Sequence, residues 1–321
     1  MTADNVIGID IGYAQTKVAY KNKIVKFPTA ISFANEIGLT YGEDNVYDFE
    51  GDKYYVGSEA VNGESFATTN FKFLLKYAPL IIYHILRKFD EFKVQKPIEV
   101  RTGLALGDWD KKEEFIERIK KITINGETIE INPVLIPQGA GVFFDYINTK
   151  RGGNPEGEIH VIDIGGNTIN SLHFSNGKPV RQKSRPYPGH GVISILRPFT
   201  NALEKKYMHS FSEQEAQKYL VRGKMIWEGR EDKEFTEYIK SIKIQFVKKL
   251  FNSILEKDKK ILGTSDIVII GGGGTYFVKD AIDEIKKAGK FLNFDVVEEP
   301  YEFSNVRGWC YNWNFKMYNL R

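Results

Sequence analysis

The sequence predicts an α/β fold built from two related halves. The sequence Ile-Asp-Ile-Gly at residues 9–12 recurs at residues 162–165, a spacing of 153 residues (162 minus 9) in a chain of 321. Each copy ends an apolar run, and a glycine turn and a second strand-like run follow it. Strand-like and helix-like stretches alternate between the copies, which is typical of α/β domains. A chain of this length has a prior of about two domains.

The first half opens with a meander of three strands and continues with mixed elements. Residues 109–121 carry apolar side chains at helical spacing among charges, as a surface helix does. The expected elements are strands at 5–11, 15–20 and 23–27, a hairpin at 46–56, a helix from about Asn70 to Phe89, a strand at 98–103, a helix at 109–121, a hairpin at 123–131, a strand at 134–136, a helix at 138–147 and a polar loop at 148–158.

The second half repeats the opening order of strand, glycine turn and strand. Residues 200–262 are expected to be mostly helical, with an apolar stripe that predicts a buried face. The stripe consists of Ile239, Ile242, Phe246, Leu250 and Ile254. The other expected elements are strands at 159–164, 168–174 and 266–270, a helix at 277–288 and a last helix packed by the aromatic cluster at 309–318.

The composition excludes several classes of protein. The 45 Lys+Arg and 42 Asp+Glu residues give a net charge of +3, which argues against a protein that wraps nucleic acid directly. The single cysteine, Cys310, excludes an intramolecular disulfide framework and a zinc site of several thiolates. No apolar run approaches the roughly 18 residues of a membrane span, and no signal-peptide pattern opens the chain. We therefore expect a cytoplasmic protein without direct contact to nucleic acid or membrane.

Asp10 stands at the end of an apolar strand, directly before a tight turn. Gly12 lets the backbone approach a ligand, and the amides of the turn can bind phosphate oxygens. Lys17 can neutralise one of these oxygens. Alone, this arrangement of Asp, Gly and Lys also fits an ordinary strand turn. The residues expected to bind phosphate here are Gly12, Tyr13, Ala14, Gln15 and Lys17.

The second copy places Asp163 before another glycine turn. Two strand-end carboxylates with two glycine turns can face each other across a cleft, which suits a triphosphate with Mg²⁺. Because Mg²⁺ keeps several waters and needs one or two carboxylates plus substrate phosphates, we expect Asp10 and Asp163 to hold it through water. The alternative is that Asp163 caps a turn and the glycines allow a bulge. The residues expected to bind phosphate here are Gly165, Gly166, Asn167 and Thr168.

Four consecutive glycines, Gly271–Gly274, lie between a strand and a helix. Glycine loses more conformational freedom on folding than any other residue, so such a run favours close approach of a ligand. We expect Gly271, Gly272 and Gly273 to lie against a base and ribose. The pattern G-x-G-x-x-G does not follow the first strand, which argues against dinucleotide binding. The absence of G-x-x-x-x-G-K-[ST] excludes a P-loop ATPase.

Residues 137–141, Pro-Gln-Gly-Ala-Gly, stand between a short strand and a helix. Gln138 carries a donor and an acceptor, so it can orient a water for in-line attack on a γ-phosphate without being a strong base. By itself, a glutamine at a helix start also fits a solvated polar residue. The comparable segment Gly189–Gly191 opens a part of the second half, and the two segments could form crossing hinge helices.

The order of these motifs resembles that of the actin and sugar-kinase superfamily over nearly the whole chain. IDIGYAQTK resembles its first phosphate motif, IPQGAGVFF its first connecting motif, VIDIGGNT its second phosphate motif and IVIIGGGGTYF its adenosine motif. The compact size, PQGAG and the segment at residues 304–308 resemble most the prokaryotic actin-like proteins of the ParM and archaeal actin group. The chain departs from the pattern at Gly166, where many relatives have an acidic or polar residue.

The resemblance implies two related actin-like, ribonuclease-H-like domains around a nucleotide cleft. The expected domains are residues 1–157 and 158–300, with about 301–321 packing back on the first. The resemblance also implies an ATPase that binds ATP or ADP with Mg²⁺ and polymerises into filaments of its own copies. Asp10, Asp163 and Gln138 would then serve hydrolysis, the carboxylates at the metal and the amide at the water. A DNA-binding adaptor would connect the filament to a plasmid or another cargo.

Two other functions remain open from the sequence. A small-molecule kinase would use the same cleft, although the sequence offers no obvious catalytic base and no cysteine-rich zinc motif. A nucleotide-binding scaffold recruited to a membrane is the other alternative, but FKMYNLR at residues 315–321 is short for an amphipathic anchor. ADP formation that depends on an added sugar or acid would favour the kinase, and co-sedimentation with liposomes would favour the scaffold.

Overall fold

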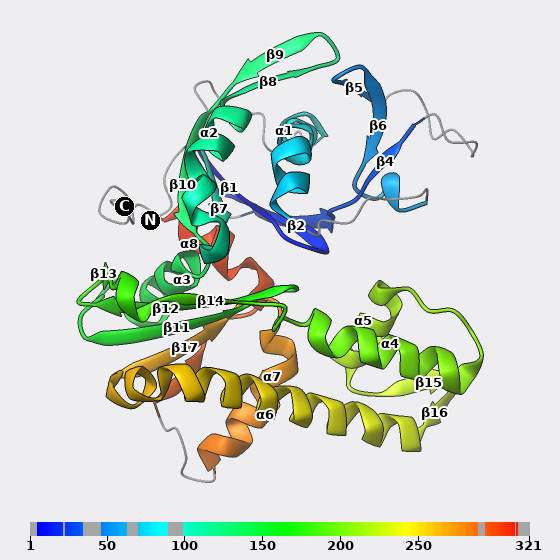
Figure 1. Ribbon diagram of the computed structural model, residues 1–321, viewed down its shortest axis with the longest axis vertical. Coiled ribbons are helices and arrows are strands. Elements are labelled where there is room, and N and C mark those ends of the chain that lie inside the picture. The colour runs from blue at the N-terminus through cyan, green and yellow to red at the C-terminus, as the bar shows by residue number, and fades with distance from the viewer. Residues whose placement is uncertain are drawn as a thin grey trace. The chain divides into compact units, whose positions relative to one another are not determined.

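The chain forms two compact units, shown in Figure 1. Unit 1 consists of Met1–Gly153 and Phe303–Arg321, and unit 2 consists of Asn154–Glu302. The computed structural model describes residues 5–21, 23–34, 46–62, 70–88, 99–287, 293–311 and 313. In this described part of the chain, none of the helices combines the length and the hydrophobicity that crossing a bilayer requires.

Unit 1 is built on a five-stranded sheet in the order β10-β7-β1-β2-β3. β1 pairs antiparallel with β2 and parallel with β7, which pairs parallel with β10. All six residues of β1 are buried, and this explains its nearly unbroken apolar sequence before Asp10. The strands are β1 (Val6–Ile11), β2 (Gln15–Tyr20), β3 (Lys23–Pro28), β7 (Glu99–Leu104) and β10 (Asn132–Pro137).

Smaller elements complete unit 1. A three-stranded sheet, β4-β6-β5, and a hairpin, β8–β9, share one apolar core with the large sheet, α1 and α2. These elements are β4 (Ile31–Phe33), β5 (Tyr47–Phe49), β6 (Asp52–Val56), η2 (Ala60–Asn62), α1 (Phe71–Lys88), η4 (Leu106–Lys111), α2 (Lys112–Lys120), β8 (Lys121–Ile124), β9 (Glu127–Glu130), α3 (Ala140–Lys150) and, after η6 (Tyr301–Phe303), α8 (Ser304–Cys310).

Unit 2 repeats the antiparallel strand pair that opens unit 1. Asp10 lies opposite Lys17 in the pair β1–β2, and Asp163 lies opposite Asn170 in the pair β11–β12, so the predicted repeat extends to the strand register. The sheet of unit 2 has the order β13-β12-β11-β17-β18, and β14 also pairs with β12. Its strands are β11 (Glu158–Ile164), β12 (Thr168–Ser175), β13 (Lys178–Pro179), β14 (Arg185–Pro188), β17 (Ile267–Gly271) and β18 (Phe294–Val296).

A long helix, α6, lies along the sheet of unit 2 (Figure 1). The five apolar residues predicted as its buried stripe are all buried, which confirms that prediction. The remaining elements of unit 2 are η5 (Arg181–Lys183), α4 (Ile193–Tyr207), α5 (Glu213–Arg222), β15 (Met225–Trp227), β16 (Arg230–Asp232), α6 (Lys233–Thr264) and α7 (Thr275–Lys287).

Some predicted elements differ from the structure. The region 200–262 is mostly helical, as expected, and also contains the hairpin β15–β16, whose turn residues Glu228 and Gly229 have φ values of +48° and +77°. Glu-Gly is a weaker sequence signal for such a turn than Asn-Gly or Asp-Gly, which explains why the hairpin was not predicted. The expected loop at 148–158 is shorter, because α3 continues to Lys150. Residues 89, 98, 288, 312 and 314–318 of the predicted elements lie outside the described residues.

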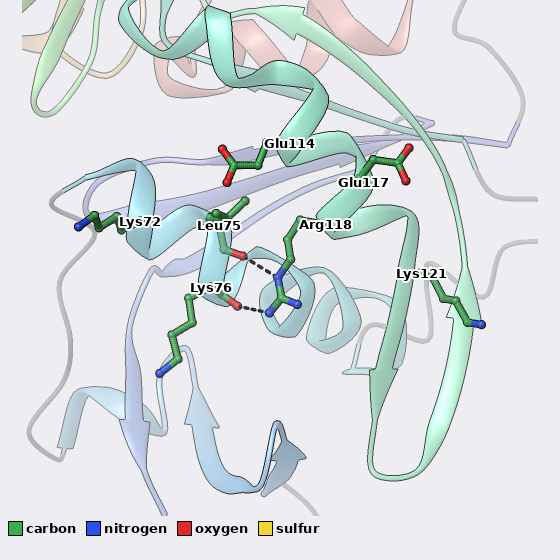
Figure 2. Close-up of a pocket in the computed structure, with 7 residues that line it drawn as sticks. All are labelled: Lys72, Leu75, Lys76, Glu114, Glu117, Arg118 and Lys121. Atoms are coloured by element: carbon green, nitrogen blue, oxygen red, sulfur yellow. Dashed lines mark hydrogen bonds between the residues drawn. The ribbon is translucent and has the colours of Figure 1, made fainter.

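Pro79 lies inside α1 and removes one hydrogen bond of this helix. Since proline has no N–H, the carbonyl of Leu75, four residues earlier, lacks its usual helical donor. Arg118 of α2 replaces that donor, because its Nε donates to Leu75 O at 2.8 Å and its Nη2 to Lys76 O at 3.2 Å (Figure 2). Nη2 also pairs with Glu50 at 2.6 Å. Arg118 therefore fastens α2 to the interrupted turn of α1, beside a surface groove of about 560 Å³.

Replacing Arg118 by Ala should lower the free energy of unfolding by about 1–2 kcal/mol, because the Leu75 carbonyl loses its donor. A Pro79→Ala background restores the missing N–H, so there R118A should cost less by about 0.5 kcal/mol or more. Urea unfolding of the four proteins measures this coupling. Lys120→Ala, at an exposed position of the same helix, is the control and should change little. Equal costs of R118A in the two backgrounds would contradict the assigned role.

Candidate functional site

The first predicted phosphate loop is the turn between β1 and β2. The N–H of Gly12 donates to the carbonyl of Gln15 at 3.2 Å, and Tyr13, Ala14 and Gln15 are half-buried. A Cβ atom at Gly12 would lie 2.7 Å from Lys17 Nζ. The ammonium group of Lys17 therefore occupies the space beside the turn that only a glycine leaves open, and it places a positive charge there.

Asp10, Lys17 and Gln138 form a polar cluster at the end of β1. Asp10 is only 6% exposed. Gln138 Nε2 donates to Asp10 Oδ1 at 3.0 Å, and Lys17 Nζ lies 3.6 Å from Asp10 Oδ2. A buried carboxylate needs such partners, because its desolvation is costly. The backbone N–H of Gln138 also donates to the carbonyl of Leu104 at 3.0 Å, which ties the residue to the end of β7.

The start of α3, directly after Gln138, is fixed by α8. Gly139 has a φ of +89°, and its N–H donates to Asn305 Oδ1 at 2.9 Å. The two helices cross at Gly141 and Gly308 so closely that a Cβ on Gly308 would overlap the carbonyl group of Gly141. Sequence reasoning did not identify Asn305 as a site residue, because it lies 166 residues from the group that it binds.

The second predicted phosphate loop, between β11 and β12, is held by the segment at residues 189–193. The N–H of Val192 donates to Gly165 O, and the N–H of Ile193 donates to Gly166 O. The N–H groups of Gly189 and Gly191 both donate to Asn167 O. The four donor–acceptor distances are 2.8–3.2 Å. Three consecutive carbonyl oxygens of the loop are therefore occupied by N–H donors of this segment. Because these oxygens already accept hydrogen bonds, they repel an anion that approaches the loop less than unbonded carbonyl oxygens would.

Gly191 is required by this packing. A Cβ at Gly191 would lie 2.6 Å from the carbonyl oxygens of both Gly165 and Gly166. Within unit 1, Gly308 of α8 crosses Gly141 of the segment at residues 137–141, whereas a crossing of that segment with Gly189–Gly191 stays a prediction. Glycine content alone does not reveal which distant segment approaches a glycine.

Asp163 and the glycine run pack against each other in unit 2. Asp163 is 3% exposed and lies opposite Gly271 in the parallel pair β11–β17. Gly272 has a φ of +80°, and a Cβ there would overlap the carboxylate of Asp163. A Cβ at Gly274 would overlap the side chain of Ile164, whose carbonyl accepts a hydrogen bond from Gly274 N at 2.8 Å. Internal packing thus explains two of the four glycines without a ligand.

Thr275, the first residue of α7, carries an unusual hydroxyl group. The residue is fully buried, and its Oγ1 has no hydrogen-bond partner among the described residues. A buried polar group without a partner costs about 1–3 kcal/mol, so it is expected where a ligand supplies the partner. Gly273, two residues earlier, is half-buried, and the atom nearest to its Cβ position would be Glu302 Cβ at 3.5 Å. Sequence reasoning ended at the glycines and missed Thr275.

The predicted residues form two groups, which we call the unit 1 cluster and the unit 2 cluster. The unit 1 cluster contains Asp10, Gly12, Tyr13, Ala14, Gln15, Lys17 and Gln138. The unit 2 cluster contains Asp163, Gly165, Gly166, Asn167, Thr168, Gly271, Gly272 and Gly273. Among the described residues, no group of three or more His, Cys, Asp or Glu side chains could hold a metal ion. A single carboxylate in either cluster, that of Asp10 or that of Asp163, suits Mg²⁺ only with phosphate and water as further ligands.

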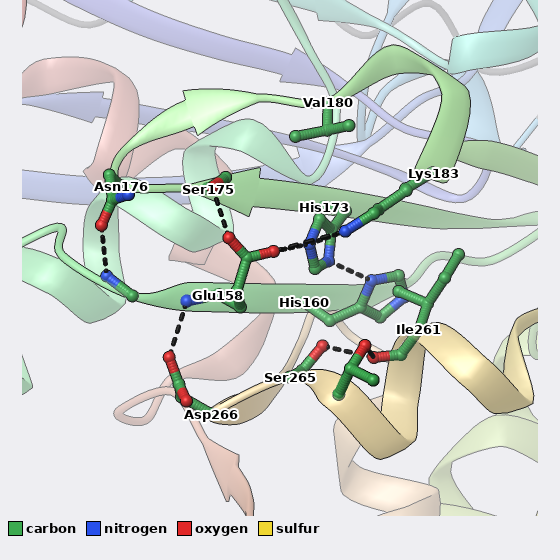
Figure 3. Close-up of polar contacts among 12 residues, drawn as sticks. Glu158, His160, His173, Ser175, Asn176, Val180, Lys183, Ile261, Ser265 and Asp266 are labelled. Atoms are coloured by element: carbon green, nitrogen blue, oxygen red, sulfur yellow. Dashed lines mark hydrogen bonds and ion pairs between the residues drawn. The ribbon is translucent and has the colours of Figure 1, made fainter.

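Unit 2 also buries titratable groups on the paired strands β11 and β12. His160 and His173 are fully buried, and their Nδ1 atoms lie 3.4 Å apart (Figure 3). His173 Nε2 lies 2.8 Å from Glu158 Oε2, which lies 3.3 Å from Lys183 Nζ. Burial, and then the neighbouring His173, lower the pKa of His160 to about 3. Burial also lowers the pKa of His173, against the opposing effect of Glu158.

Two family models match this chain. The model described as the N-terminal domain of actin-like proteins matches residues 8–141, and the model described as the C-terminal domain of the archaeal MreB-like actin homologue matches residues 161–284. The chain therefore belongs to the actin-like proteins. Within them, its second half is of the archaeal MreB-like kind, so the predicted resemblance is confirmed. A comparison with curated proteins finds no match.

Solved structures of actin homologues share the fold over nearly the whole chain. The archaeal actin homologue Ta0583, solved in complex with ADP, is 20% identical with a TM-score of 0.72, over 96% of this chain and 98% of that one. A non-polymerisable quadruple mutant of pCBH ParM is 21% identical with a TM-score of 0.74, over 96% of this chain and 98% of that one. The ParM chain of a 15-stranded filament from Clostridium botulinum is 21% identical with a TM-score of 0.71, over 97% of this chain and 98% of that one. The predicted fold class, two related actin-like domains, is confirmed.

Lowering the pH from 7 to 5 should destabilise the protein through His160. An unfolded histidine has a pKa near 6.5, so below that pH the unfolded chain binds a proton that the folded chain, with its pKa of about 3, does not. The stabilising contribution is complete above pH 6.5 and falls as the pH drops towards 3. At about 1.4 kcal/mol per pH unit, His160 alone should cost about 2 kcal/mol by pH 5.

Urea unfolding at pH 7, 6 and 5 measures this loss. His160→Gln keeps a polar group near Ser171 and should reduce the pH dependence. His209→Gln, at an exposed position, is the matched control and should retain the wild-type slope. If the free energy of unfolding of His160→Gln changed with pH as much as that of the wild type, His160 would not be the group responsible.

Proposed function

We propose that this chain binds ATP with Mg²⁺, assembles into filaments of its own copies and hydrolyses the nucleotide. The observation that carries the proposal is the unit 1 cluster, in which the amide of Gln138 is bonded to the buried Asp10 beside the ammonium group of Lys17. The ADP complex of the Ta0583 homologue supports nucleotide binding. The ParM filament of C. botulinum supports self-assembly.

Each predicted domain contributes one phosphate loop to the proposed nucleotide site. The N–H groups of Gly12 and Gly165 close the two turns through Gln15 O and Thr168 O, so other N–H groups of these turns would bind phosphate oxygens. Lys17 would neutralise part of the phosphate charge. Gly271–Gly273 would lie against the base and ribose, where the hydroxyl of Thr275 offers a further polar contact. Mg²⁺, held by Asp10 and Asp163 through water, would neutralise further charge on the phosphates.

The geometry of Gln138 supports the proposed role in orienting a water. Its Nε2 donates to Asp10, so the amide group is fixed and the Oε1 atom is turned away from that carboxylate. Oε1 can therefore accept a hydrogen bond from a water and orient it for attack on the terminal phosphate. The backbone of the same segment is held by Leu104 and Asn305, which keeps this position defined.

We further propose that the filament segregates a plasmid or positions another cargo through a DNA-binding adaptor in the cytoplasm. The net charge of +3, from 45 basic and 42 acidic residues, supports an indirect connection to DNA rather than binding by this chain itself. The same charge balance supports an assembly without a membrane partner.

Sedimentation with MgATP should yield a pellet of this protein that is absent without nucleotide, over a range of salt concentrations. Asp163→Asn removes one of the two proposed carboxylates and should abolish the ATP-dependent pellet. Asp280→Asn, at an exposed position of α7, is the control and should pellet like the wild type. No pellet of the wild-type protein at micromolar concentration would contradict filament formation. ATP consumption only with an added sugar or acid would point to a kinase.

Gln138→Ala should slow phosphate release by about a hundredfold, because the attacking water loses its orienting group. The affinity for MgATP should change by no more than a few-fold, since the phosphate loops are intact. Phosphate release and calorimetric titration measure the two quantities. Gln182→Ala, at an exposed position of unit 2, should match the wild type in both. Unchanged phosphate release in Gln138→Ala would refute the assigned role.

A further inference from the structure

β14 is a strand that its backbone holds weakly. Two of its four residues, Pro186 and Pro188, have no N–H, so only Arg185 and Tyr187 can donate backbone hydrogen bonds. Within the described part of the chain, β14 pairs with β12 and with no other strand. The position of β14 therefore depends on contacts made by its side chains.

Asp258 of α6 provides these contacts. Its side chain is fully buried, and Oδ2 accepts hydrogen bonds from Tyr187 OH at 2.7 Å and from Ser171 Oγ at 3.1 Å. Oδ1 lies 3.0 Å from Arg185 Nε, whose N–H is not aligned with it, so this contact is an ion pair rather than a hydrogen bond. A carboxylate is stable in a protein interior only with such partners. Asp258 and β14 therefore hold each other in place.

The direction of the Ser171 hydroxyl is fixed from the other side. Ser171 gives its one proton to Asp258, so its oxygen must accept the hydrogen bond from His160 Nε2, which lies 2.8 Å away. Burial keeps His160 neutral, and its Nδ1 lies 3.4 Å from His173 Nδ1 (Figure 3). The two links from His160 through Ser171 to Asp258 thus each have a defined proton.

β14 leads directly into the segment that holds the second phosphate loop. Arg185 lies opposite Ser171, and Pro188 lies opposite Thr168, the last residue of that loop. The next five residues, 189–193, donate the four hydrogen bonds that occupy the carbonyls of Gly165, Gly166 and Asn167. Asp258 and the loop are thus separated by about three residues of strand, or about 10 Å, with continuous bonding between them.

We infer that Asp258 is a positioning residue for the second phosphate loop. By fixing β14, it fixes the segment at residues 189–193, and this segment turns the loop's carbonyls away from an approaching anion. The part of this inference that concerns nucleotide affinity rests on the proposed function. The part that concerns the order of the segment does not, so the two are tested separately.

Hydrogen exchange of the nucleotide-free protein tests the positioning. Tyr187→Phe removes one hydrogen bond to Asp258 and fills the same space, while Asp258→Ala removes all three contacts. Amides of the peptide that spans residues 189–193 should exchange about tenfold faster in Tyr187→Phe and faster still in Asp258→Ala. The matched control is Ile254→Val, which loses one buried methylene of α6 four residues earlier and removes none of the polar groups around Asp258.

A calorimetric titration with MgATP provides the functional measurement. Tyr187→Phe should bind MgATP with a Kd raised about tenfold, whereas Ile254→Val should bind like the wild type even though urea unfolds it more readily. Equal exchange at 189–193 in Tyr187→Phe and wild type, or equal acceleration in Ile254→Val, would overturn the positioning role. Should Asp258→Ala fail to fold, Tyr187→Phe decides the matter alone. Wild-type protein that binds no MgATP would refute the proposed function, while the exchange result would still test the positioning.

Discussion

Each unit of this protein buries a carboxylate at the end of its central strand, and the surrounding chain must come close enough to stabilise it. Asp10 and Asp163 are both less than a tenth exposed. A carboxylate in this environment costs several kcal/mol unless polar groups replace its water. The glycine turns, the close crossings and the polar side chains around these two residues all follow from this requirement.

The two units meet the requirement in different ways. In unit 1, the side chains of Gln138 and Lys17 contact the carboxylate of Asp10. In unit 2, the counterpart of Lys17 in strand register is the buried Asn170, and the backbone at Gly272 packs against Asp163 instead. The repeat therefore preserved the strand pairing and changed the partners. A cation remains beside the first loop, while the second loop depends on the backbone segment at residues 189–193.

Local patterns predicted much of this fold. The two strand pairs could be predicted from apolar runs with glycine turns, and the buried stripe of α6 from its helical spacing. Each of these signals is formed by residues that are close together in the sequence. Contacts between residues far apart in the sequence could not be predicted from such local patterns. Nothing around Gly141 indicates that Gly308 crosses it, and nothing around Leu75 indicates that Arg118 replaces the donor that Pro79 removes.

Asp258 is a buried residue that the sequence analysis did not predict, although one feature of the sequence indicates its burial. It stands in the sequence Glu-Lys-Asp-Lys-Lys, and a charged run of this kind predicts a solvated helix face. The other four residues are indeed exposed. The buried stripe, however, passes through Phe246, Leu250 and Ile254 at intervals of four, and the next step reaches Asp258. A charge at the next position of an apolar stripe is a signal that a partner must lie opposite it, although only the fold identifies β14 as that partner.

The glycines themselves are weaker evidence for a ligand than their number indicates. Gly191, Gly272 and Gly274 are each required by neighbouring atoms of the same unit, so packing alone would select them. The features that packing does not explain are polar: the buried Thr275 hydroxyl, which has no partner among the described residues, and the ammonium group of Lys17 beside the turn at Gly12. These groups, together with a loop whose carbonyls are already bonded, support the proposed phosphate compound more strongly than glycine content does.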